Sequence, residues 1–258
     1  MSVLDRFSLD GKVALVTGGA GLYGRFITEG LAEAGAFVYV ASRNLDNCRA
    51  IASKLSERGL SASAAELDLS DPGSIDVLYR RIMGEQGRID ILVNNAVLRP
   101  MRRYEDPLEA FRTSMEVNAV GVFNITRTFA EAMKERREGS VINISSIHGM
   151  VGPDFTLYEG TSMDAPPDYF FHKAGLINLT RYLASKLGPY GIRVNCVSPG
   201  GLFNYQDGKF VERYNRRTFL GRMAEGEDIK GVVVFLASDA SKYITGANIP
   251  VDGGYTAK

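Results

Sequence analysis

The sequence contains few residues of the kinds that form disulfides or bind metals. Only two cysteines, Cys48 and Cys196, occur among 258 residues, and they lie far apart along the chain. A disulfide framework or a thiolate metal site is therefore not expected. With only two histidines, His148 and His172, a zinc site is also poorly supported. The composition predicts a protein without a metal centre whose thiols stay reduced.

The sequence also lacks an excess of either charge and any long apolar run. Lys plus Arg and Asp plus Glu both number 30, so the formal net charge is zero. A balanced chain gives no reason to expect nucleic acid or an anionic membrane as partner. Residues 1–12 contain no signal-peptide core, and the longest apolar runs, such as VVVFLA at 232–237, are too short to span a bilayer. We therefore expect a cytoplasmic enzyme or binding domain.

Short apolar runs alternate with longer amphipathic stretches along the whole chain. The apolar runs predict strands at 13–17, 37–41, 61–68, 89–95, 140–145, 192–198 and 248–252. Helices are expected after the first run through residue 34, over 45–58, 74–83, 107–136 and 169–187, and near 228–236. Because the strands are continuously apolar, they fit a parallel sheet covered on both faces. The predicted fold class is α/β: a doubly wound, parallel, seven-stranded Rossmann sheet with helices on both faces, in a single domain over residues 1–258.

A glycine cluster, TGGAGLYG at 17–24, follows the first strand and opens the first helix. Glycines allow a tight turn and a close approach to a pyrophosphate, whose charge then lies at the helix N-terminus. The alternative is a tight strand–helix connection that binds nothing, but the strand–turn–helix context favours dinucleotide binding. The predicted cofactor-binding residues of this cluster are Gly18, Gly19, Gly21, Leu22, Tyr23 and Gly24.

The end of the second strand bears on which dinucleotide is bound. In such folds an acid at this point binds the ribose hydroxyls of NAD, whereas an arginine accommodates the 2′-phosphate of NADP. Here Ser42 and Arg43 follow the strand, and no acid occurs before Asp46. A guanidinium can bind a phosphate through two hydrogen bonds. We predict NADP(H) as the preferred cofactor, with NAD(H) as a possible one; an ordinary surface arginine is the alternative reading of Arg43.

Further motifs follow in a fixed order, and together they identify a family resemblance. They are LD at 67–68, NNA at 94–96, VN at 117–118, NISS at 143–146, YFFHK at 169–173 and SPGG at 198–201. With the glycine cluster, they resemble the short-chain dehydrogenase/reductase family over almost the whole chain, in its short, single-domain branch. The resemblance implies an oxidoreductase with the catalytic tetrad Asn118, Ser146, Tyr169 and Lys173. It also implies a homotetramer or homodimer, and cofactor contacts from Asp68, Leu69, Asn94, Asn95, Ala96, Tyr169, Lys173, Pro199, Gly200 and Leu202.

Two positions depart from the pattern of the short branch. Leu22 stands where the middle glycine is usual, and Val97 replaces the glycine after NNA. The glycine spacing is instead similar to that of the extended branch, which contains nucleotide-sugar epimerases and dehydratases. That branch carries a larger C-terminal substrate domain, for which 258 residues leave little room. An epimerase or dehydratase that recycles its cofactor, and a regulatory protein that binds NADP without catalysis, remain the alternatives.

The spacing of tyrosine and lysine selects the acid/base residue. The pKa of a free tyrosine is about 10, and a nearby ammonium lowers it by favouring the phenolate. Residues four apart share a helix face, as Tyr169 and Lys173 do, whereas Tyr158 has Ser162 at that distance. Tyr169 is therefore the predicted acid/base, the alternative being a helix-surface pair without function. In the family's scheme Asn118 holds a water that relays protons to Lys173; a buried amide bonded to backbone is the rival interpretation.

The interval between Ser146 and Tyr169 is longer than the resemblance implies. The extra segment, at about 147–168, contains three prolines that restrict its backbone. Asp168 is expected to cap the helix that starts at Tyr169. We expect the segment to lie over the substrate pocket, at the carboxyl ends of the strands, with Tyr158 as a candidate substrate contact. His148 is a second candidate, or else a structural histidine, and His172 has no expected role in proton transfer.

Three arginines follow NNAV in another segment expected beside the pocket. Arg99, Arg102 and Arg103 could bind a phosphate or carboxylate of the substrate, or could form a solvated turn with nearby acids. The string YEGTSM at 158–163 is also similar to oxidoreductases of flagellin modification and nonulosonic-acid synthesis, which implies a sugar or nucleotide-sugar substrate. The predicted reaction is hydride transfer between NADP(H) and a secondary alcohol or ketone, on a polar, sugar-like or sugar-acid small molecule.

Overall fold

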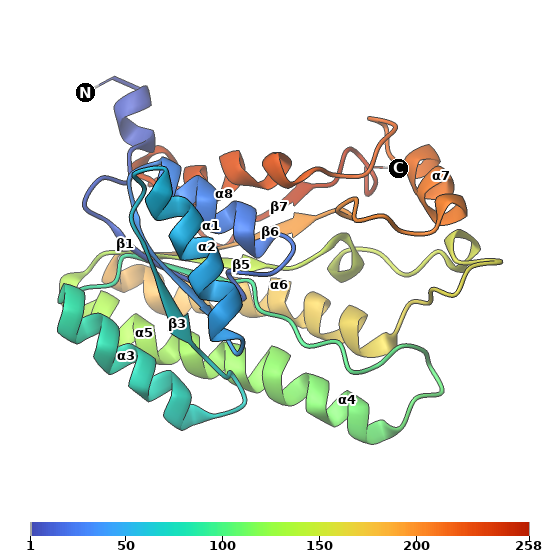
Figure 1. The fold of residues 1–258 in the computed structure, drawn as a ribbon, viewed down its shortest axis with the longest axis horizontal. Helices are drawn as coiled ribbons and strands as arrows, with labels where there is room; N and C mark the ends of the chain where they lie inside the picture. Colours follow the sequence, from blue (N-terminus) through green and yellow to red (C-terminus); the bar gives the residue numbers. More distant parts are fainter. Residues whose placement is uncertain (1, 258) are drawn as a thin grey trace.

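The computed structural model describes residues 2–257 and places seven strands in one parallel sheet (Figure 1). The strands are β1 (Val13–Thr17), β2 (Phe37–Ser42), β3 (Ala62–Glu66), β4 (Ile91–Asn94), β5 (Gly139–Ile144), β6 (Ile192–Pro199) and β7 (Asn248–Val251). Their order in the sheet is β3-β2-β1-β4-β5-β6-β7, and every neighbouring pair is parallel. The predicted doubly wound, seven-stranded α/β fold is therefore confirmed.

Helices fill the connections between the strands. The α-helices are α1 (Gly24–Glu33), α2 (Leu45–Glu57), α3 (Pro72–Gln86), α4 (Leu108–Met115), α5 (Val122–Arg136), α6 (Pro167–Leu187), α7 (Gly208–Arg217) and α8 (Lys230–Ala237). The short 3₁₀ segments are η1 (Leu4–Phe7), η3 (Ile147–Gly149), η4 (Phe155–Leu157), η5 (Gly188–Tyr190), η6 (Gly226–Ile229) and η7 (Asp239–Ser241), and η2 (Glu116–Gly121) is a π-helical turn.

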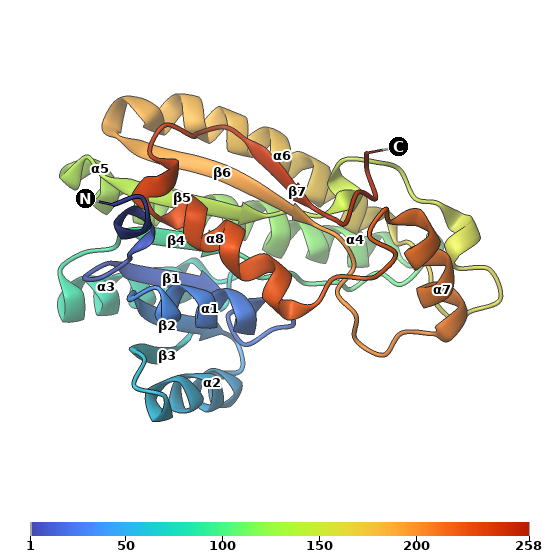
Figure 2. The ribbon, with the colours of Figure 1, turned by 90° about the horizontal axis from the view of Figure 1, so that it is seen from above.

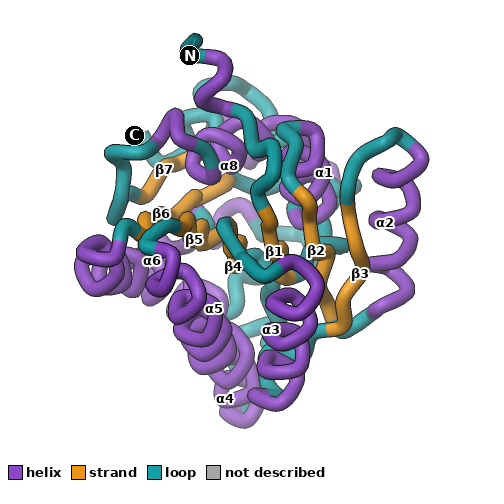
Figure 3. The backbone as a smooth tube through the Cα atoms, turned by 90° about the vertical axis from the view of Figure 1, so that its left-hand side faces the viewer, coloured by secondary structure: helices purple, strands orange, loops and turns teal. Residues whose placement is uncertain are grey.

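The helices form one layer on each face of the sheet (Figures 2 and 3). On one face, Val16 of β1 belongs to a buried cluster with Leu31 of α1 and Leu236 of α8. On the other, the adjacent Leu15 belongs to a cluster with Phe129 of α5. Because successive strand residues enter different cores, both kinds of position must be apolar. This explains the unbroken apolar runs of the sequence.

The carboxyl ends of the parallel strands bring the loops that follow them to one edge of the sheet. The chain winds outward in opposite directions from β1 and β4, so a crevice is expected between the ends of these strands. The hydroxyl of Thr17 accepts hydrogen bonds from the backbone N–H groups of Asn95 and Ala96, both at 3.0 Å. The amide of Asn95 in turn donates to the carbonyls of Thr17 and Gly18, at 3.1 and 2.9 Å. The glycine loop and the NNA segment are thus fixed to each other.

The predicted helix over 107–136 is interrupted, and another helix was missed. The turn η2 separates α4 from α5 at the level of Asn118. The sequence pattern gave no helix at 208–217, where the structure has α7. Across residues 2–257, no helix combines the length and the apolar character that crossing a bilayer requires.

The start of α6 also differs from the prediction. The helix begins at Pro167, with Pro166 as an N-cap residue that offers no side-chain hydrogen bond. Proline suits the first helical position because the N–H there needs no partner. The prediction that Asp168 caps the helix is therefore wrong. Asp168 lies inside the first turn with 0% exposure, and neither carboxylate oxygen has a hydrogen-bond partner in the described chain.

Candidate active site and cofactor cleft

A cleft of about 540 Å³ opens at the carboxyl edge of the sheet. It collects predicted site residues from five separate segments: Gly18, Gly21, Leu22, Tyr23, Asn95, Ala96, Arg99, Ser146, His148, Tyr158, Tyr169, Lys173, Pro199, Gly200 and Leu202. A smaller cavity of about 250 Å³ is lined by Ser42, Arg43, Asp68, Leu69 and residues near them, and shares Gly18, Ala96 and Val97 with the cleft. Gly19, Gly24, Asn94, Arg102 and Asn118 are not among the lining residues of either.

The glycine loop leaves room for a phosphate group close to the backbone. Gly18 has a φ of +62°, and a Cβ there would lie 2.8 Å from the Cα of Ala96. A Cβ on Gly24 would lie 2.0 Å from the carbonyl oxygen of Gly18. The N-cap of α1, Tyr23, supplies no side-chain hydrogen bond, although the N–H groups of Arg25 and Phe26 already donate to the backbone carbonyls of Gly21 and Tyr23, at 3.1 Å each. The N-terminus of the helix still presents its positive dipole end to this loop. These features fit the pyrophosphate of a dinucleotide.

Tyr23 also connects the glycine loop to the loop after β6. Its hydroxyl donates a hydrogen bond to the carbonyl oxygen of Gly200 at 3.0 Å. Gly201 is held from the other side, because its N–H donates to the Tyr214 hydroxyl at 2.6 Å. The loop after β6 is therefore bonded to the glycine loop through Tyr23 and to helix α7 through Tyr214.

The smaller cavity combines a carboxylate with a guanidinium. Asp68 accepts hydrogen bonds from the N–H and hydroxyl of Ser70 at 2.9 and 2.6 Å. These bonds lower the pKa of Asp68, and the charge of Arg43 lowers it further, so the carboxylate is ionised at neutral pH. Asp46, the first acid after the second strand, pairs with Arg49 at 2.9 Å. The exposed Arg43 lines this cavity beside the Asp68 carboxylate, while the hydroxyl of Ser42, which also lines it, donates to the carbonyl of Asn44 at 3.1 Å.

The half-buried Tyr169 and the buried Lys173 form a coupled pair. The ammonium of Lys173 lies 5.6 Å from the centre of the Tyr169 ring and donates to the carbonyl of Ile144 at 2.7 Å. Burial opposes ionisation of Tyr169, but the charges of Lys173 and Arg99 outweigh it and lower the pKa of the phenol. Burial raises the pKa of Tyr158 to about 12, so that residue stays protonated. The electrostatics support Tyr169 as the acid/base.

The two adjacent serines have different surroundings. Ser145 donates from its hydroxyl to the carbonyl of Lys173 at 2.8 Å, which attaches α6 to the end of β5. Ser146 accepts from the N–H of His148 at 3.1 Å and lines the cleft, and its hydrogen bonding lowers the pKa of Tyr169. Ser145 lines the cleft as well, but its hydroxyl hydrogen is used by the backbone, which favours Ser146 as the donor to a substrate oxygen.

Asn118 holds the backbone of the segment that follows NNA. Its amide donates to the carbonyl of Leu98 at 2.7 Å and to the hydroxyl of Ser114 at 3.0 Å. Its oxygen accepts from the N–H of Leu98 at 2.9 Å. Both amide hydrogens are thus bonded within the protein, which is the second of the two interpretations of this residue. A role in proton relay remains a prediction.

Two other residues predicted for the site, Asn94 and Arg102, make structural contacts and do not line the cleft, so their roles remain predictions. The amide of Asn94 donates to Thr126 and to Asn143, both at 2.8 Å, and joins β4 to β5 and α5. Asn94 is 3% exposed and is not among the residues that line the cleft. The backbone N–H of Arg102 donates to the carboxylate of Asp106, which matches the solvated turn considered for this segment.

Arg99, unlike Arg102, reaches the catalytic tyrosine. Its guanidinium carbon lies 4.4 Å from the centre of the Tyr169 ring. Nearby, His148 stacks on Phe170 with ring centres 4.4 Å apart and meets the Tyr169 ring edge at 5.9 Å. Burial, and then the charge of Arg99, lower the pKa of His148 to about 4. The imidazole is therefore neutral at pH 7 and offers a substrate both a donor and an acceptor.

The inserted segment covers the cleft together with α7. The guanidinium of Arg213 donates to the carbonyls of Thr156 and Glu159, at 3.1 and 2.5 Å. Arg217, one turn further along α7, forms an ion pair with Asp154. Residues of this cover that line the cleft and that the sequence analysis did not single out are Leu157, Met163, Asp164, Phe210 and Tyr214. In the sequence, the four-residue spacing of Phe210 and Tyr214 is the pattern that could have indicated one face of helix α7.

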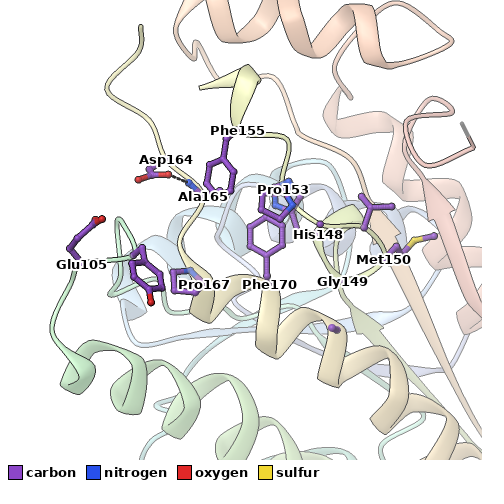
Figure 4. Close-up of a pocket in the computed structure, with 14 residues that line it drawn as sticks. Glu105, His148, Gly149, Met150, Pro153, Phe155, Asp164, Ala165, Pro167 and Phe170 are labelled. Atoms are coloured by element: carbon purple, nitrogen blue, oxygen red, sulfur yellow. Dashed lines mark hydrogen bonds between the residues drawn. The ribbon is translucent and has the colours of Figure 1, made fainter. Parts of the chain in front are cut away.

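A second cavity, of about 690 Å³, adjoins the cleft (Figure 4). Figure 4 shows Phe155, Pro153 and Phe170 around it, with Glu105 at one side. His148, Asp164, Ala165 and Phe170 line both this cavity and the cleft. The stacked rings of His148 and Phe170 thus belong to the shared boundary, and Phe170 is a site residue that the sequence analysis missed.

Comparison with known proteins agrees with this geometry. The family model described as enoyl-(acyl carrier protein) reductase matches residues 21–256. L-rhamnose 1-dehydrogenase (NAD(P)(+)) from Azotobacter vinelandii is 36% identical over 94% of this chain and 96% of its own length. 3-Oxoacyl-(acyl carrier protein) reductase from Aquifex aeolicus is 34% identical over 95% of this chain and 98% of its own. The crystal structure of a gluconate 5-dehydrogenase from Burkholderia cenocepacia in complex with NADP and tartrate is similar, with a TM-score of 0.90, 30% identity and complete coverage of both chains.

The chain belongs to the short-chain dehydrogenase/reductase family. It is an NAD(P)-dependent oxidoreductase that transfers a hydride between the cofactor and an alcohol or carbonyl group of a small molecule. Family membership and the cleft therefore agree on the class of reaction.

Proposed function

We propose that the chain is an NADP(H)-dependent dehydrogenase/reductase of polar, sugar-like or sugar-acid substrates, with Tyr169 as the acid/base. The observation that carries this proposal is the environment of the Tyr169 phenol. It faces the cleft with a lowered pKa, between the ammonium of Lys173, the hydroxyl of Ser146 and the guanidinium of Arg99.

The residues of the cleft divide the proton chemistry among them. NADP(H), when bound, accepts or supplies the hydride. In the oxidative direction the Tyr169 phenolate removes the proton of the substrate hydroxyl; in the reductive direction the phenol returns a proton to the carbonyl oxygen. Ser146 donates a hydrogen bond to the same oxygen, where negative charge develops. Lys173, fixed by the carbonyl of Ile144, stabilises the phenolate in a site whose burial strengthens the interaction.

The polar lining of the cleft supports a hydroxylated substrate. Besides the catalytic groups, His148, Tyr158, Asp164 and Gln206 bring hydrogen-bonding side chains to it. The relatives named as a rhamnose dehydrogenase and a gluconate 5-dehydrogenase act on molecules of this kind by their names. Arg99 offers a cation for a carboxylate, which favours a sugar acid among them.

The preference for NADP(H) is supported by the smaller cavity. Arg43 is exposed there, while the nearest following acid, Asp46, is engaged with Arg49. A guanidinium without an acid in the ribose position suits a 2′-phosphate. Titration with NADPH and NADH, followed by nicotinamide fluorescence, tests this proposal. Tighter binding of NADH than of NADPH would overturn it.

A homotetramer or homodimer is the proposed assembly. Phe123, Phe171 and Tyr182 expose 40%, 64% and 60% of their surface on the neighbouring helices α5 and α6. Large exposed aromatic side chains are enriched at protein interfaces. Light scattering after size exclusion measures the mass directly, and a monomer at micromolar concentration would contradict the proposal.

Paired tyrosine variants test the catalytic assignment. We expect Tyr169→Phe to lower kcat by at least about 10²-fold while retaining NADPH binding, because only the proton donor is removed. Tyr158→Phe should keep measurable turnover, since Tyr158 is protonated and lies off the Lys173 face. The substrates to compare are sugar acids, polyols and a 3-oxoacyl thioester. Robust turnover by Tyr169→Phe would overturn the mechanism, and turnover of the thioester alone would overturn the substrate class.

A further inference from the structure

We propose that Arg99 is a second cation for the catalytic tyrosine, held in place by Asn118 and acting as a positioning residue for the phenolate of Tyr169. This inference deepens the proposed function and rests on it. It concerns a residue outside the Asn–Ser–Tyr–Lys tetrad. This residue lies in the segment after NNA and contacts the ring of Tyr169.

The geometry places two cations on one aromatic ring. The guanidinium carbon of Arg99 lies 4.4 Å from the ring centre of Tyr169, closer than the ammonium of Lys173 at 5.6 Å. Both side chains line the cleft with the tyrosine. A cation over the face of a tyrosine is attracted by the ring itself, and it favours the phenolate further.

The backbone of Arg99 is fixed on both sides. The preceding residue, Leu98, is bonded through its N–H and its carbonyl to the amide of Asn118, at 2.9 and 2.7 Å. The following residue is Pro100, which restricts Arg99 to extended backbone conformations. Beyond it, Met101 is 4% exposed and anchors the segment in the protein. The exposed side chain of Arg99 is thus held beside Tyr169 by a segment whose backbone has little conformational freedom.

The two cations are not equivalent. Burial lowers the pKa of Lys173, the Tyr169 phenolate opposes this, and the charge of Arg99 lowers the Lys173 pKa further. A guanidinium, in contrast, remains charged at any pH at which a protein is folded. Arg99 therefore supplies a permanent positive charge, whereas the charge of Lys173 depends on its coupled titration with Tyr169.

The remaining ionisable groups around the phenol do not supply a comparable charge. Tyr23 from the glycine loop and Tyr158 from the inserted segment have raised pKa values because of burial, so both are neutral. Burial lowers the pKa of His148, from η3, to about 4, and of His172, on α6, to about 3. Two carboxylates belong to the same surroundings: Asp164 lines the cleft, and the buried Asp168 precedes Tyr169 in the first turn of α6.

The sign of the effect follows from these charges. Removal of the Arg99 charge raises the pKa of Tyr169, because the phenolate loses one of its two cations. An opposite charge at this range shifts a pKa by about one unit or more. Alcohol oxidation needs the phenolate, so the rising limb of its pH profile should move about one unit towards alkaline pH. Below that limb, this corresponds to an about tenfold lower rate at fixed pH.

The experiment compares Arg99→Gln, Arg99→Lys and the control Arg103→Gln, which removes a neighbouring arginine that does not line the cleft. The Tyr169 phenolate is titrated by ultraviolet difference absorbance, as each protein minus the same protein with Tyr169→Phe, without any substrate. The same proteins are assayed for oxidation of a neutral polyol and of a sugar acid over a range of pH. NADPH binding checks that each variant is folded.

We expect the phenolate midpoint to rise by about one unit in Arg99→Gln, to return part of the way in Arg99→Lys, and to be unchanged in Arg103→Gln. The pH limb for the neutral polyol should follow the midpoint. An unchanged midpoint, with only the KM of the sugar acid raised, would overturn the inference and make Arg99 a substrate anchor alone. A shifted midpoint in a protein that turns over no alcohol would support the inference while refuting the proposed function.

Discussion

Substitution of Gly24 by alanine should disrupt the cofactor loop, and the structure gives the size of the conflict. An added Cβ would lie 2.0 Å from the carbonyl oxygen of Gly18 and 2.8 Å from the amide nitrogen of Asn95. The first distance is far inside the contact range of about 3.5 Å, and the obstacle is backbone, so the loop itself must move. Overpacking of this kind costs about 1–3 kcal/mol of unfolding free energy. The displaced loop should also bind NADPH at least about tenfold more weakly, a loss of about 1.4 kcal/mol.

A second glycine provides the matched control. Gly84 lies exposed on α3, and an added Cβ there meets no atom within 4 Å. Gly84→Ala should stabilise the protein by about 0.5–1 kcal/mol and leave NADPH binding unchanged, because alanine only improves helix propensity. Urea denaturation gives both free energies, and fluorescence titration gives the affinities. Wild-type stability and wild-type NADPH affinity in Gly24→Ala would refute the reasoning, since the measured clash would then carry no energy.

Three further perturbations test other parts of the site. Arg43→Leu should weaken NADPH binding at least about tenfold while leaving NADH binding unchanged. Arg49→Leu, on the helix α2 that follows Arg43, is the control, and equal losses for both cofactors would disprove a 2′-phosphate contact. Phe170→Ala should join the cleft to the adjoining cavity and raise kcat/KM for bulkier alcohols relative to small ones. Loss of the stack with His148 should contribute about 0.5–1.5 kcal/mol to the decrease in unfolding free energy. Unchanged relative kcat/KM values would contradict the shared boundary. Burial lowers the pKa of His172 from 6.5 to about 3. Between these pH values the unfolded chain binds a proton at His172 and the folded protein does not, so the free energy of unfolding should fall as pH falls below 6.5. Down to about pH 4.5 this loss is about 3 kcal/mol, from two pH units at about 1.4 kcal/mol each, and it should be smaller in His172→Gln. Parallel curves for the two proteins would disprove it.

The sheet was predictable because its information is local. Each strand is a short, unbroken apolar run between polar or glycine-rich stretches, and the two buried faces of β1 require that pattern. The pairing of Tyr169 with Lys173 is equally local, since the four-residue spacing places both on one side of α6. Short-range periodicity therefore determined the sheet and pointed to the acid/base pair.

The missed features depend on contacts between distant parts of the chain. Helix α7 packs Phe210 and Tyr214 against Ile147 and Leu157, more than 50 residues away, and its amphipathic pattern is too short to stand out alone. The stack of Arg99 on Tyr169 joins segments 70 residues apart, so the pattern RPMRR gave no means of telling Arg99 from its neighbours. The prediction that Asp168 caps α6 was wrong for a local reason. The helix begins at Pro167, one residue before Asp168, so Asp168 lies inside its first turn.

The bond between Asn118 and Leu98 has a consequence for how such a site can change over evolutionary time. Asn118, placed by the π-helical turn η2, recognises only the N–H and the carbonyl of Leu98, which every amino acid except proline provides. Mutations can therefore replace the side chain at position 99 without breaking the bonds that hold the backbone of Leu98 near the tyrosine. Position 99 lies beside the phenol of Tyr169, and its side-chain charge can be changed by a single substitution. Such a substitution can give the enzyme a new substrate preference or a new pH optimum.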